Sequence, residues 1–210
     1  MIALENVSKK FLSKKVLQSI DCTIPSGQKV LLSGPNGAGK TTLLKMIAGM
    51  VKPTTGSITY DSMNIWDDIR SFRGRLGLVL DESFLYADLS LWDNLIFYAR
   101  LYRVRNADEK INAWAETFAL KNHLHVEVRS FSKGERQKAS LIRALMHEPP
   151  MLILDEPMSG LDTVSKAKLL EILGTTNSTI VFSAHEDLSK ETWIHRNFSL
   201  SGGTLVERHA

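Results

Sequence analysis

The stretch Lys29-Val-Leu-Leu-Ser-Gly-Pro-Asn-Gly-Ala-Gly-Lys-Thr-Thr42 decides the fold of this 210-residue chain. Its first five residues, Lys29–Ser33, form a short apolar run typical of a buried β-strand. A glycine-rich loop follows at once, and beyond it apolar residues recur at positions 43, 44, 46, 47 and 50, which is helical spacing. A strand that passes through glycines directly into a helix is the local structure on which phosphate-binding loops are built.

The loop matches the pattern G-x-x-x-x-G-K-T. Glycines allow the backbone to wrap closely and aim N–H groups at phosphate oxygens, and a helix N-terminus favours anions. We expect the Lys40 ammonium to reach the β and γ phosphates of a nucleotide and the Thr41 hydroxyl to coordinate Mg²⁺. A glycine-rich turn with a chance lysine is the alternative, which the flanking strand and helix disfavour. The candidate nucleotide-binding residues here are Gly34, Pro35, Asn36, Gly37, Ala38, Gly39, Lys40, Thr41 and Thr42.

A phosphate loop alone would also fit a small-molecule kinase or a GTPase. A second motif narrows the choice among these enzyme classes. Met151–Leu154 is an apolar run that leads into Asp155, Glu156 and Pro157. The carboxyl end of a buried parallel strand faces the ligand crevice of an α/β sheet. We therefore expect Asp155 to hold Mg²⁺ through water and Glu156 to polarise the water that attacks the γ-phosphate. An acidic N-cap of the next helix would explain one carboxylate but not the pair.

The third motif is Phe131-Ser-Lys-Gly-Glu-Arg-Gln137, at the start of a helical pattern. Taken with the other two motifs, in this order and spacing, it resembles the signature loop of the ATP-binding cassette (ABC) family. Ser159–Asp162 is similar to the D-loop of that family, and His185 to its switch histidine. The resemblance covers nearly the whole chain, from Leu4 through the C-terminal hairpin.

Roles for single residues follow from this resemblance. It implies that Ser132 and the Gly134 backbone meet the γ-phosphate. It also implies that His185 hydrogen-bonds the γ-phosphate and that Phe11 stacks on adenine. Phe11 could instead be a half-buried aromatic residue near a hairpin, and a lone histidine after a buried strand is often a core residue. The expected catalytic residues are Glu156, His185 and Lys40.

The segment after the apolar run Leu76–Leu80 departs from the family pattern. Most members carry a glutamine there that contacts Mg²⁺ and the attacking water, whereas this chain has Asp81-Glu82-Ser83. Either carboxylate can offer an oxygen to Mg²⁺, but an ionised one cannot donate a hydrogen bond as an amide does. By position alone, Asp81 joins Thr41 and Asp155 as an expected metal ligand.

The signature loop departs from the pattern as well. Lys133 stands where the family has a glycine, and Glu135 where it has a glutamine. Ser132 and Gly134, which carry the groups expected to meet the γ-phosphate, are present. We therefore expect a working site in which Lys133 is the least family-like element.

The rest of the chain alternates apolar runs with helical patterns. Strands are expected at Met1–Val7, Val16–Ile24, Ser57–Tyr60, Leu76–Leu80, Met151–Leu154 and Thr179–Ser183, helices near 90–103, 107–119, 134–147 and 163–173, and a closing hairpin at Phe198–Leu200 and Thr204–Val206. This alternation indicates an α/β fold. We expect a P-loop NTPase core with a parallel sheet, an N-terminal antiparallel β subdomain and an inserted helical subdomain at about 84–147, all within one domain, 1–210.

The composition is that of an ordinary globular chain, with 43% hydrophobic and 23% charged residues. A net charge of +3 is too small to indicate nucleic-acid binding. The single cysteine, Cys22, excludes an internal disulfide and fits a reducing compartment. The N-terminus lacks the apolar run of a secretory signal, and no stretch approaches the roughly 18 apolar residues of a membrane span. His123 and His125 lack a third ligand and are interpreted as surface loop residues.

The resemblance implies an ATPase that powers transport. Family members pair head to tail with ATP between the phosphate loop of one copy and the signature loop of the other, and we expect a homodimer because Glu156 and His185 are both present. An integral membrane transporter subunit would dock against Asp81–Arg103 and hold the chain on the cytoplasmic face of the membrane. By likeness to small exporter subunits, the expected cargo is haem for cytochrome c maturation, with lipid, polysaccharide or drug as alternatives. A soluble ABC ATPase acting on the ribosome or DNA is the other reading, although such proteins typically carry tandem cassettes or coiled-coil insertions.

Overall fold

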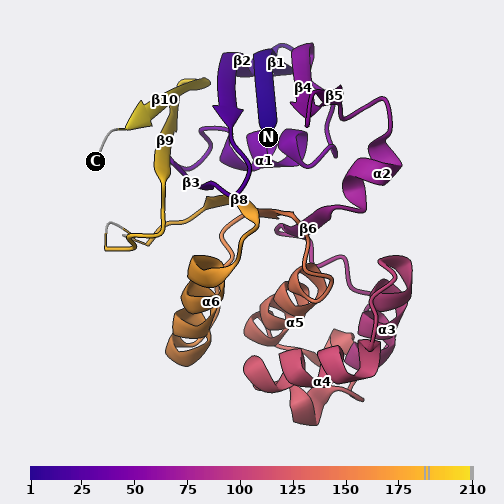
Figure 1. The fold of residues 1–210 in the computed structure, drawn as a ribbon. Coiled ribbons are helices and arrows are strands. Elements are labelled where there is room, and N and C mark those ends of the chain that lie inside the picture. The colour runs from indigo at the N-terminus through magenta and orange to yellow at the C-terminus, as the bar shows by residue number, and fades with distance from the viewer. Residues whose placement is uncertain (187, 189, 209–210) are drawn as a thin grey trace. The chain divides into compact units, whose positions relative to one another are not determined.

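The chain divides into two compact units. The computed structural model describes residues 1–186, 188 and 190–208. The first unit comprises Met1–Leu78, Pro150–Glu156 and the segment from Asn177 onward, and the second comprises Val79–Pro149 and Pro157–Thr176. The sequence predicted one insertion at about 84–147, whereas the second unit also includes a later segment that contains helix α6 (Figure 1).

An antiparallel sheet with the strand order β2-β1-β4-β5 opens the first unit. Strands β1 (Ile2–Phe11) and β2 (Lys14–Ile24) form a hairpin, β4 (Thr55–Tyr60) pairs with the other edge of β1, and β5 (Met63–Asn64) pairs with β4. The predicted N-terminal antiparallel subdomain is confirmed. Cys22 lies in β2, where burial raises the pKa of its thiol to about 11, so the thiol is poorly reactive.

A second sheet has the strand order β10-β9-β3-β8-β7-β6. Its strands are β3 (Lys29–Ser33), β6 (Leu76–Val79), β7 (Met151–Leu154), β8 (Thr179–Ser183), β9 (Arg196–Ser201) and β10 (Thr204–Arg208). β3 pairs in parallel with β8 and β9, and β7 pairs in parallel with β8, as the continuous apolar runs of β3, β7 and β8 predicted. β10 runs antiparallel to β9, so the predicted closing hairpin forms one edge of the sheet.

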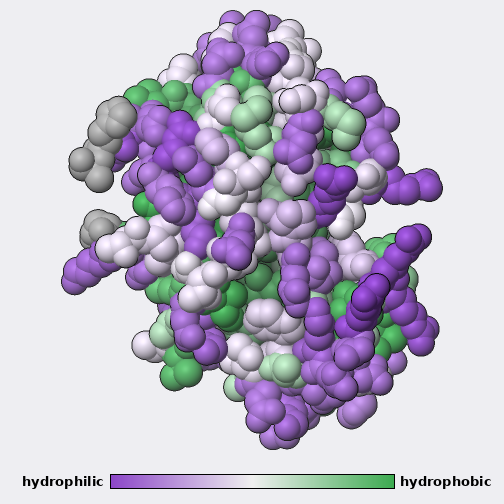
Figure 2. Space-filling view, in the orientation of Figure 1, coloured by the Kyte–Doolittle hydropathy of each residue, from purple (hydrophilic) through white to green (hydrophobic). Residues whose placement is uncertain are grey.

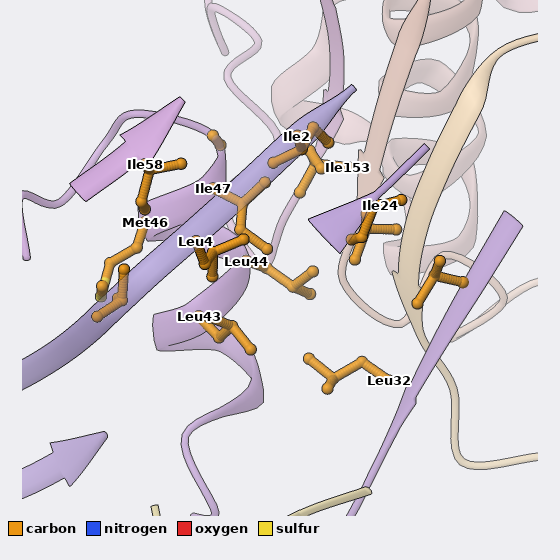
Figure 3. Close-up of a cluster of buried hydrophobic side chains, with 14 of the residues drawn as sticks. Ile2, Leu4, Ile24, Leu32, Leu43, Leu44, Met46, Ile47, Ile58 and Ile153 are labelled. Carbon is orange, nitrogen blue, oxygen red and sulfur yellow. The ribbon is translucent and has the colours of Figure 1, made fainter. Parts of the chain in front are cut away.

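The core of the first unit gathers around helix α1 (Lys40–Ile47). Figure 3 shows Leu4 of β1 together with Leu44 and Ile47 of the helix in one apolar cluster. All three side chains are almost completely buried, so the helix that follows the phosphate loop is anchored by packing on one face. Helix α2 (Ile69–Arg73) begins at Asp68, whose side chain accepts a hydrogen bond from the Ser71 N–H.

The second unit is built from helices. They are α3 (Leu91–Leu101), α4 (Ala107–Thr117), α5 (Lys133–Leu145) and α6 (Thr163–Thr175), with single 3₁₀ turns at Lys121–His123 and Val128–Ser130. The fully buried Asn94 fixes the loop before α3, because its side chain bonds the Tyr86 N–H and the carbonyl oxygens of Tyr86 and Ser90.

A buried arginine organises the segment between β6 and α3. Arg143 of α5 is 4% exposed, and its guanidinium lies 5.3 Å from the ring centroid of Phe84 and 5.2 Å from that of Tyr98. The Tyr98 hydroxyl donates to the Phe84 carbonyl oxygen, and Phe84 has a left-handed backbone with φ 54°. Burial lowers the pKa of Arg143. The cation–π contacts partly offset the cost of burying this charge.

No helix in the described part of the chain combines the length and apolar character needed to cross a bilayer. The face in Figure 2 is mainly hydrophilic, and its apolar residues lie in scattered patches.

Gly56 tests how closely β4 approaches β1. It has φ +84°, and a Cβ there would lie 2.3 Å from the Asn6 carbonyl oxygen and 2.4 Å from that of Glu5. We expect Gly56→Ala to lower the free energy of unfolding by about 3 kcal/mol or more, because left-handed strain adds to a clash with backbone atoms. Urea denaturation measures the loss. Gly202→Ala is the matched control, since Gly202 has φ +57° and open space around its Cβ position. Equal losses in the two variants would contradict the steric argument.

Candidate nucleotide-binding site

The phosphate loop has a backbone that only glycine adopts easily. Gly34, Gly37 and Gly39 have φ values of 141°, 76° and 106°. At Gly34 a Cβ would also lie 2.3 Å from the Leu200 carbonyl oxygen of β9, so a larger residue cannot fit. Helix α1 begins at Lys40, directly after the loop. The N-terminus of α1 therefore opens into a loop whose N–H groups can surround an anion.

Lys40 lies folded over its own loop. Its Nζ donates to the carbonyl oxygens of Gly34, at 2.8 Å, and Pro35, at 3.3 Å. The residue is only 7% exposed. A buried ammonium requires acceptors, and the two carbonyls supply them here. Phosphate oxygens could replace these acceptors with little movement of the side chain.

Asp155 is held by two hydroxyl groups. Its Oδ2 accepts from Thr41 Oγ1 and its Oδ1 accepts from Ser183 Oγ, both at 2.5 Å. Asp155 is 4% exposed and follows β7 directly, as the sequence predicted. Ser183, the last residue of β8, was not predicted as part of the site. In the sequence, Ser183 stands out as a polar residue at the end of a mainly apolar strand. In the structure, that strand lies next to β7, which leads into Asp155.

Glu156 and His185 lie in direct contact. The distance from Glu156 Oε1 to His185 Nε2 is 2.6 Å, and both side chains are partly exposed. Glu156 has a left-handed backbone with φ 48°, and its N–H donates to Ser183 Oγ. The left-handed turn at Glu156 directs its carboxylate to the end of β8, where His185 follows. His185 lines one cavity with Gly34, so two groups able to exchange or orient a proton lie beside the phosphate loop.

The donor set suits a nucleotide with Mg²⁺. Thr41 Oγ1 and Asp155 Oδ2 are hard oxygen ligands, which Mg²⁺ prefers. The described residues contain no group of three or more His, Cys, Asp or Glu side chains that could hold a metal ion without other ligands. A cation here would therefore need phosphate and water oxygens, and this is the usual coordination of nucleotide-bound Mg²⁺.

Phe11 lies at the end of β1 and is 47% exposed. One face of its ring is covered by the Lys9 ammonium, 4.9 Å from the ring centroid. The hairpin approaches the phosphate loop, because a Cβ at Gly39 would lie 3.1 Å from Val16 Cγ1. An exposed ring on this hairpin is compatible with stacking on a base.

The signature-loop residues begin α5 in the second unit. Ser132 is the N-cap: its Oγ accepts from the Glu135 N–H, and its own N–H donates to Glu135 Oε2. This capping box explains why a glutamate is tolerated where the family has glutamine, and these bonds lower the pKa of Glu135. Gly134 must be glycine, because a Cβ there would lie 2.6 Å from the Gly160 carbonyl oxygen. Ser132 and Lys133 are exposed at the helix start.

Asp81 is exposed in the second unit. It lines a cavity of about 360 Å³ together with Lys133 and Arg136. The two positions that depart most from the family pattern, Asp81 and Lys133, thus share one cavity with opposite charges. A role of Asp81 in metal binding stays a prediction.

The histidines near α5 do not form a metal site in the described residues. His123 Nε2 lies 3.4 Å from Glu135 Oε1, and its ring packs edge-on against Phe131. His125 is exposed, and its ring lies 6.0 Å from that of Trp92.

The sequence of this chain is similar to those of known proteins. The family model described as ABC transporter matches residues 17–159. The ABC transporter ATP-binding protein NatA of Bacillus subtilis (strain 168) is 34% identical over 195 residues, which are 88% of this chain and 79% of that protein. The linearmycin resistance ATP-binding protein LnrL of the same organism is 32% identical over 190 residues, 88% of this chain and 61% of that protein.

Solved structures agree on the fold. A dimeric structure of a post-hydrolysis state of the ATP-binding cassette MJ0796, bound to ADP and Pi, superposes with a TM-score of 0.89 at 24% identity, over 99% of this chain and 98% of that one. Since the family model covers more than half of the sequence and the identity to NatA extends over most of both proteins, the chain belongs to the ABC transporter family and carries its ATP-binding, ATP-hydrolysing domain.

Proposed function

We propose that this chain hydrolyses ATP at the site formed by α1, β7 and β8, and that it does so to drive export across a membrane. The observation that carries the catalytic part is the 2.6 Å contact between Glu156 and His185, next to the hydroxyl-bonded Asp155. Glu156 polarises the attacking water, His185 orients Glu156 and contacts the γ-phosphate, and Lys40 neutralises phosphate charge. Phe11 stacks on the adenine ring.

Thr41 and Asp155 hold Mg²⁺ when the nucleotide is bound. The ion would neutralise phosphate charge there. The hydrogen bond from Thr41 to Asp155 keeps the two oxygens together beforehand, so little reorganisation is needed.

The functional unit is a homodimer. Ser132 is exposed at the N-terminus of α5, where a phosphate of a nucleotide held by a second copy can approach. The partly exposed Gly134 follows two residues later in the same helix turn. The dimeric arrangement of the MJ0796 cassette supports this assembly.

A membrane subunit docks on the second unit and holds the chain at the cytoplasmic face. Four large apolar side chains around α3 are exposed between 40% and 60%: Tyr86, Leu89, Phe97 and Leu101. Tyr86 and Phe97 contact each other edge to face at 5.3 Å. Phe84, in the segment that precedes α3, packs against the buried Arg143. Exposed apolar residues gathered on one element favour an interaction site.

The cargo follows from the relatives rather than from residues of this chain. Export is supported by the relative named for linearmycin resistance. The same relative favours a drug-like cargo over haem for cytochrome c maturation, the cargo expected from the sequence. Lipid and polysaccharide remain alternatives, and identifying the membrane subunit from the adjacent gene tests all four.

Lys40→Ala tests the phosphate loop. We expect ATP turnover to fall at least about 100-fold, because the variant removes the positive charge that meets the phosphates. Steady-state phosphate release measures this, and circular dichroism checks the fold. Lys45→Ala, in the last turn of the same helix, is the control and should retain activity. Turnover near the wild-type rate in Lys40→Ala would contradict the assignment.

Glu156→Gln tests the catalytic contact and the dimer together. The amide keeps the size of the side chain but loses its negative charge, so turnover should fall about 10²- to 10⁴-fold while ATP still binds. The variant should accumulate as a dimer in ATP and Mg²⁺ during size-exclusion chromatography. Adding Ser132→Arg should make that dimer dissociate, because the larger side chain would block the contact between Ser132 and the γ-phosphate. Glu148→Gln, at an exposed ion pair of the second unit, is the control. A variant that binds ATP, fails to cleave it and elutes as a monomer would rule out the shared site.

Phe97→Asp tests the docking surface. The charge should abolish membrane association in the native host, because it would be buried against the partner without a counter-charge. Fractionation of cell membranes measures the loss, and the ATPase activity of the purified chain should be unchanged. Met63→Asp introduces the same charge at an exposed apolar residue of the first unit and should leave membrane association intact. Identical behaviour of the two variants would argue against α3.

A further inference from the structure

The tip of the β1–β2 hairpin concentrates positive charge. Its sequence, Lys9-Lys-Phe-Leu-Ser-Lys-Lys15, places four lysines around an apolar pair. Phe11 is 47% exposed and Leu12 is completely exposed. Within the described part of the chain, Lys10, Lys14 and Lys15 take part in no ion pair.

The lysines repel one another where they stand. Lys10 and Lys15 are directly opposite each other in the strand pairing, and Lys14 is opposite Phe11. Like charges at directly opposed positions destabilise a hairpin. Lys9 adds to the cluster, and its Nζ donates to the carbonyl oxygen of Lys52. A polyanion that approached the tip would relieve this repulsion.

The position of β2 indicates which polyanion can approach. A Cβ at Gly39 of the phosphate loop would lie 3.1 Å from Val16 Cγ1 and 3.0 Å from Leu17 Cδ2, so the start of β2 packs against that loop. The Cα atoms of Lys15 and Lys14 lie within about 4 Å and about 7 Å of the Val16 Cα along the chain. The Debye length is about 8 Å at physiological ionic strength and about 30 Å at 0.01 M salt, so charges carried this near the loop are only partly screened at low salt. The exposed Lys14 and Lys15 therefore add positive charge near the loop that an approaching anion enters.

We infer that the lysine-rich hairpin tip steers the polyphosphate of a purine nucleotide into the phosphate loop. This inference rests on the proposed function, and it adds a kinetic role for Lys14 and Lys15 that is separate from adenine stacking by Phe11. Because the attraction acts before contact, the lysines raise the association rate constant and leave the dissociation rate constant unchanged. A basic loop with an exposed apolar pair would also suit an anionic membrane surface. The packing of β2 against Gly39 favours the nucleotide.

Stopped-flow binding of methylanthraniloyl-ATP to the full chain tests the inference. In Lys14→Gln/Lys15→Gln we expect the association rate constant to fall about 3- to 10-fold at low salt. The difference should disappear at about 0.5 M salt, because screening then acts within about 4 Å. Lys121→Gln/Lys168→Gln removes the same charge from exposed ion pairs of the second unit and should bind at the wild-type rate.

The outcomes separate the inference from the proposed function. An unchanged association rate constant in the hairpin variant overturns steering, whereas failure of the wild-type chain to bind the analogue overturns the proposed function. A change confined to the dissociation rate constant also overturns steering, since it would indicate direct contact. Sedimentation with phosphatidylglycerol vesicles that requires Lys14 and Lys15, with nucleotide association unchanged, would assign the tip to a membrane surface and overturn the inference.

Discussion

The buried carboxyl group of Asp155 is the constraint on which the site depends. A carboxyl group removed from water must be hydrogen-bonded, and each of its oxygens accepts a hydroxyl, one from Thr41 and one from Ser183. These two bonds join the first turn of α1, the end of β7 and the end of β8. The second hydroxyl also accepts the Glu156 N–H, so the same serine orients the residue that we propose polarises water. Removing any member would leave a buried polar atom without its partner, which costs about 1–3 kcal/mol.

Local chemistry made much of the site predictable. The glycines before Lys40 and the carboxylates after β7 each lie at a single junction at the end of a strand, so roles could be proposed for them without knowing the fold. Ser183 could not be found in this way, because its role depends on the pairing of β7 with β8, in which Leu154 lies beside Phe182. The burial of Lys40 could not be predicted from the sequence either, because it depends on the path of a long side chain whose ammonium turns back to carbonyls of its own loop.

The extent of the second unit was harder to predict, because it depends on contacts between segments distant in sequence. The Lys138 ammonium lies 2.5 Å from the Asp162 carboxylate, and Gln137 donates to the Pro157 carbonyl oxygen. The hydrogen bond with Lys138 is the main reason that the pKa of Asp162 lies well below its usual range. It has this effect although the carboxylate is largely exposed. Asp162 also caps α6 through the Ser165 N–H. The helix that follows β7 is thereby attached to α5, although its sequence gives only a helical period and no sign of its partner.

The close contact between Gly34 and β9 has a consequence for how the protein can be shortened. The Leu200 carbonyl oxygen forms one wall of the phosphate loop, and the turn at Gly203 packs against the Val16 backbone. Every motif that carries the chemistry precedes this hairpin in the chain. A truncated version that ended just before β9 would keep all of those motifs and still lose the wall that shapes the loop. Expression boundaries for this protein should therefore follow the sheet rather than the last recognisable motif.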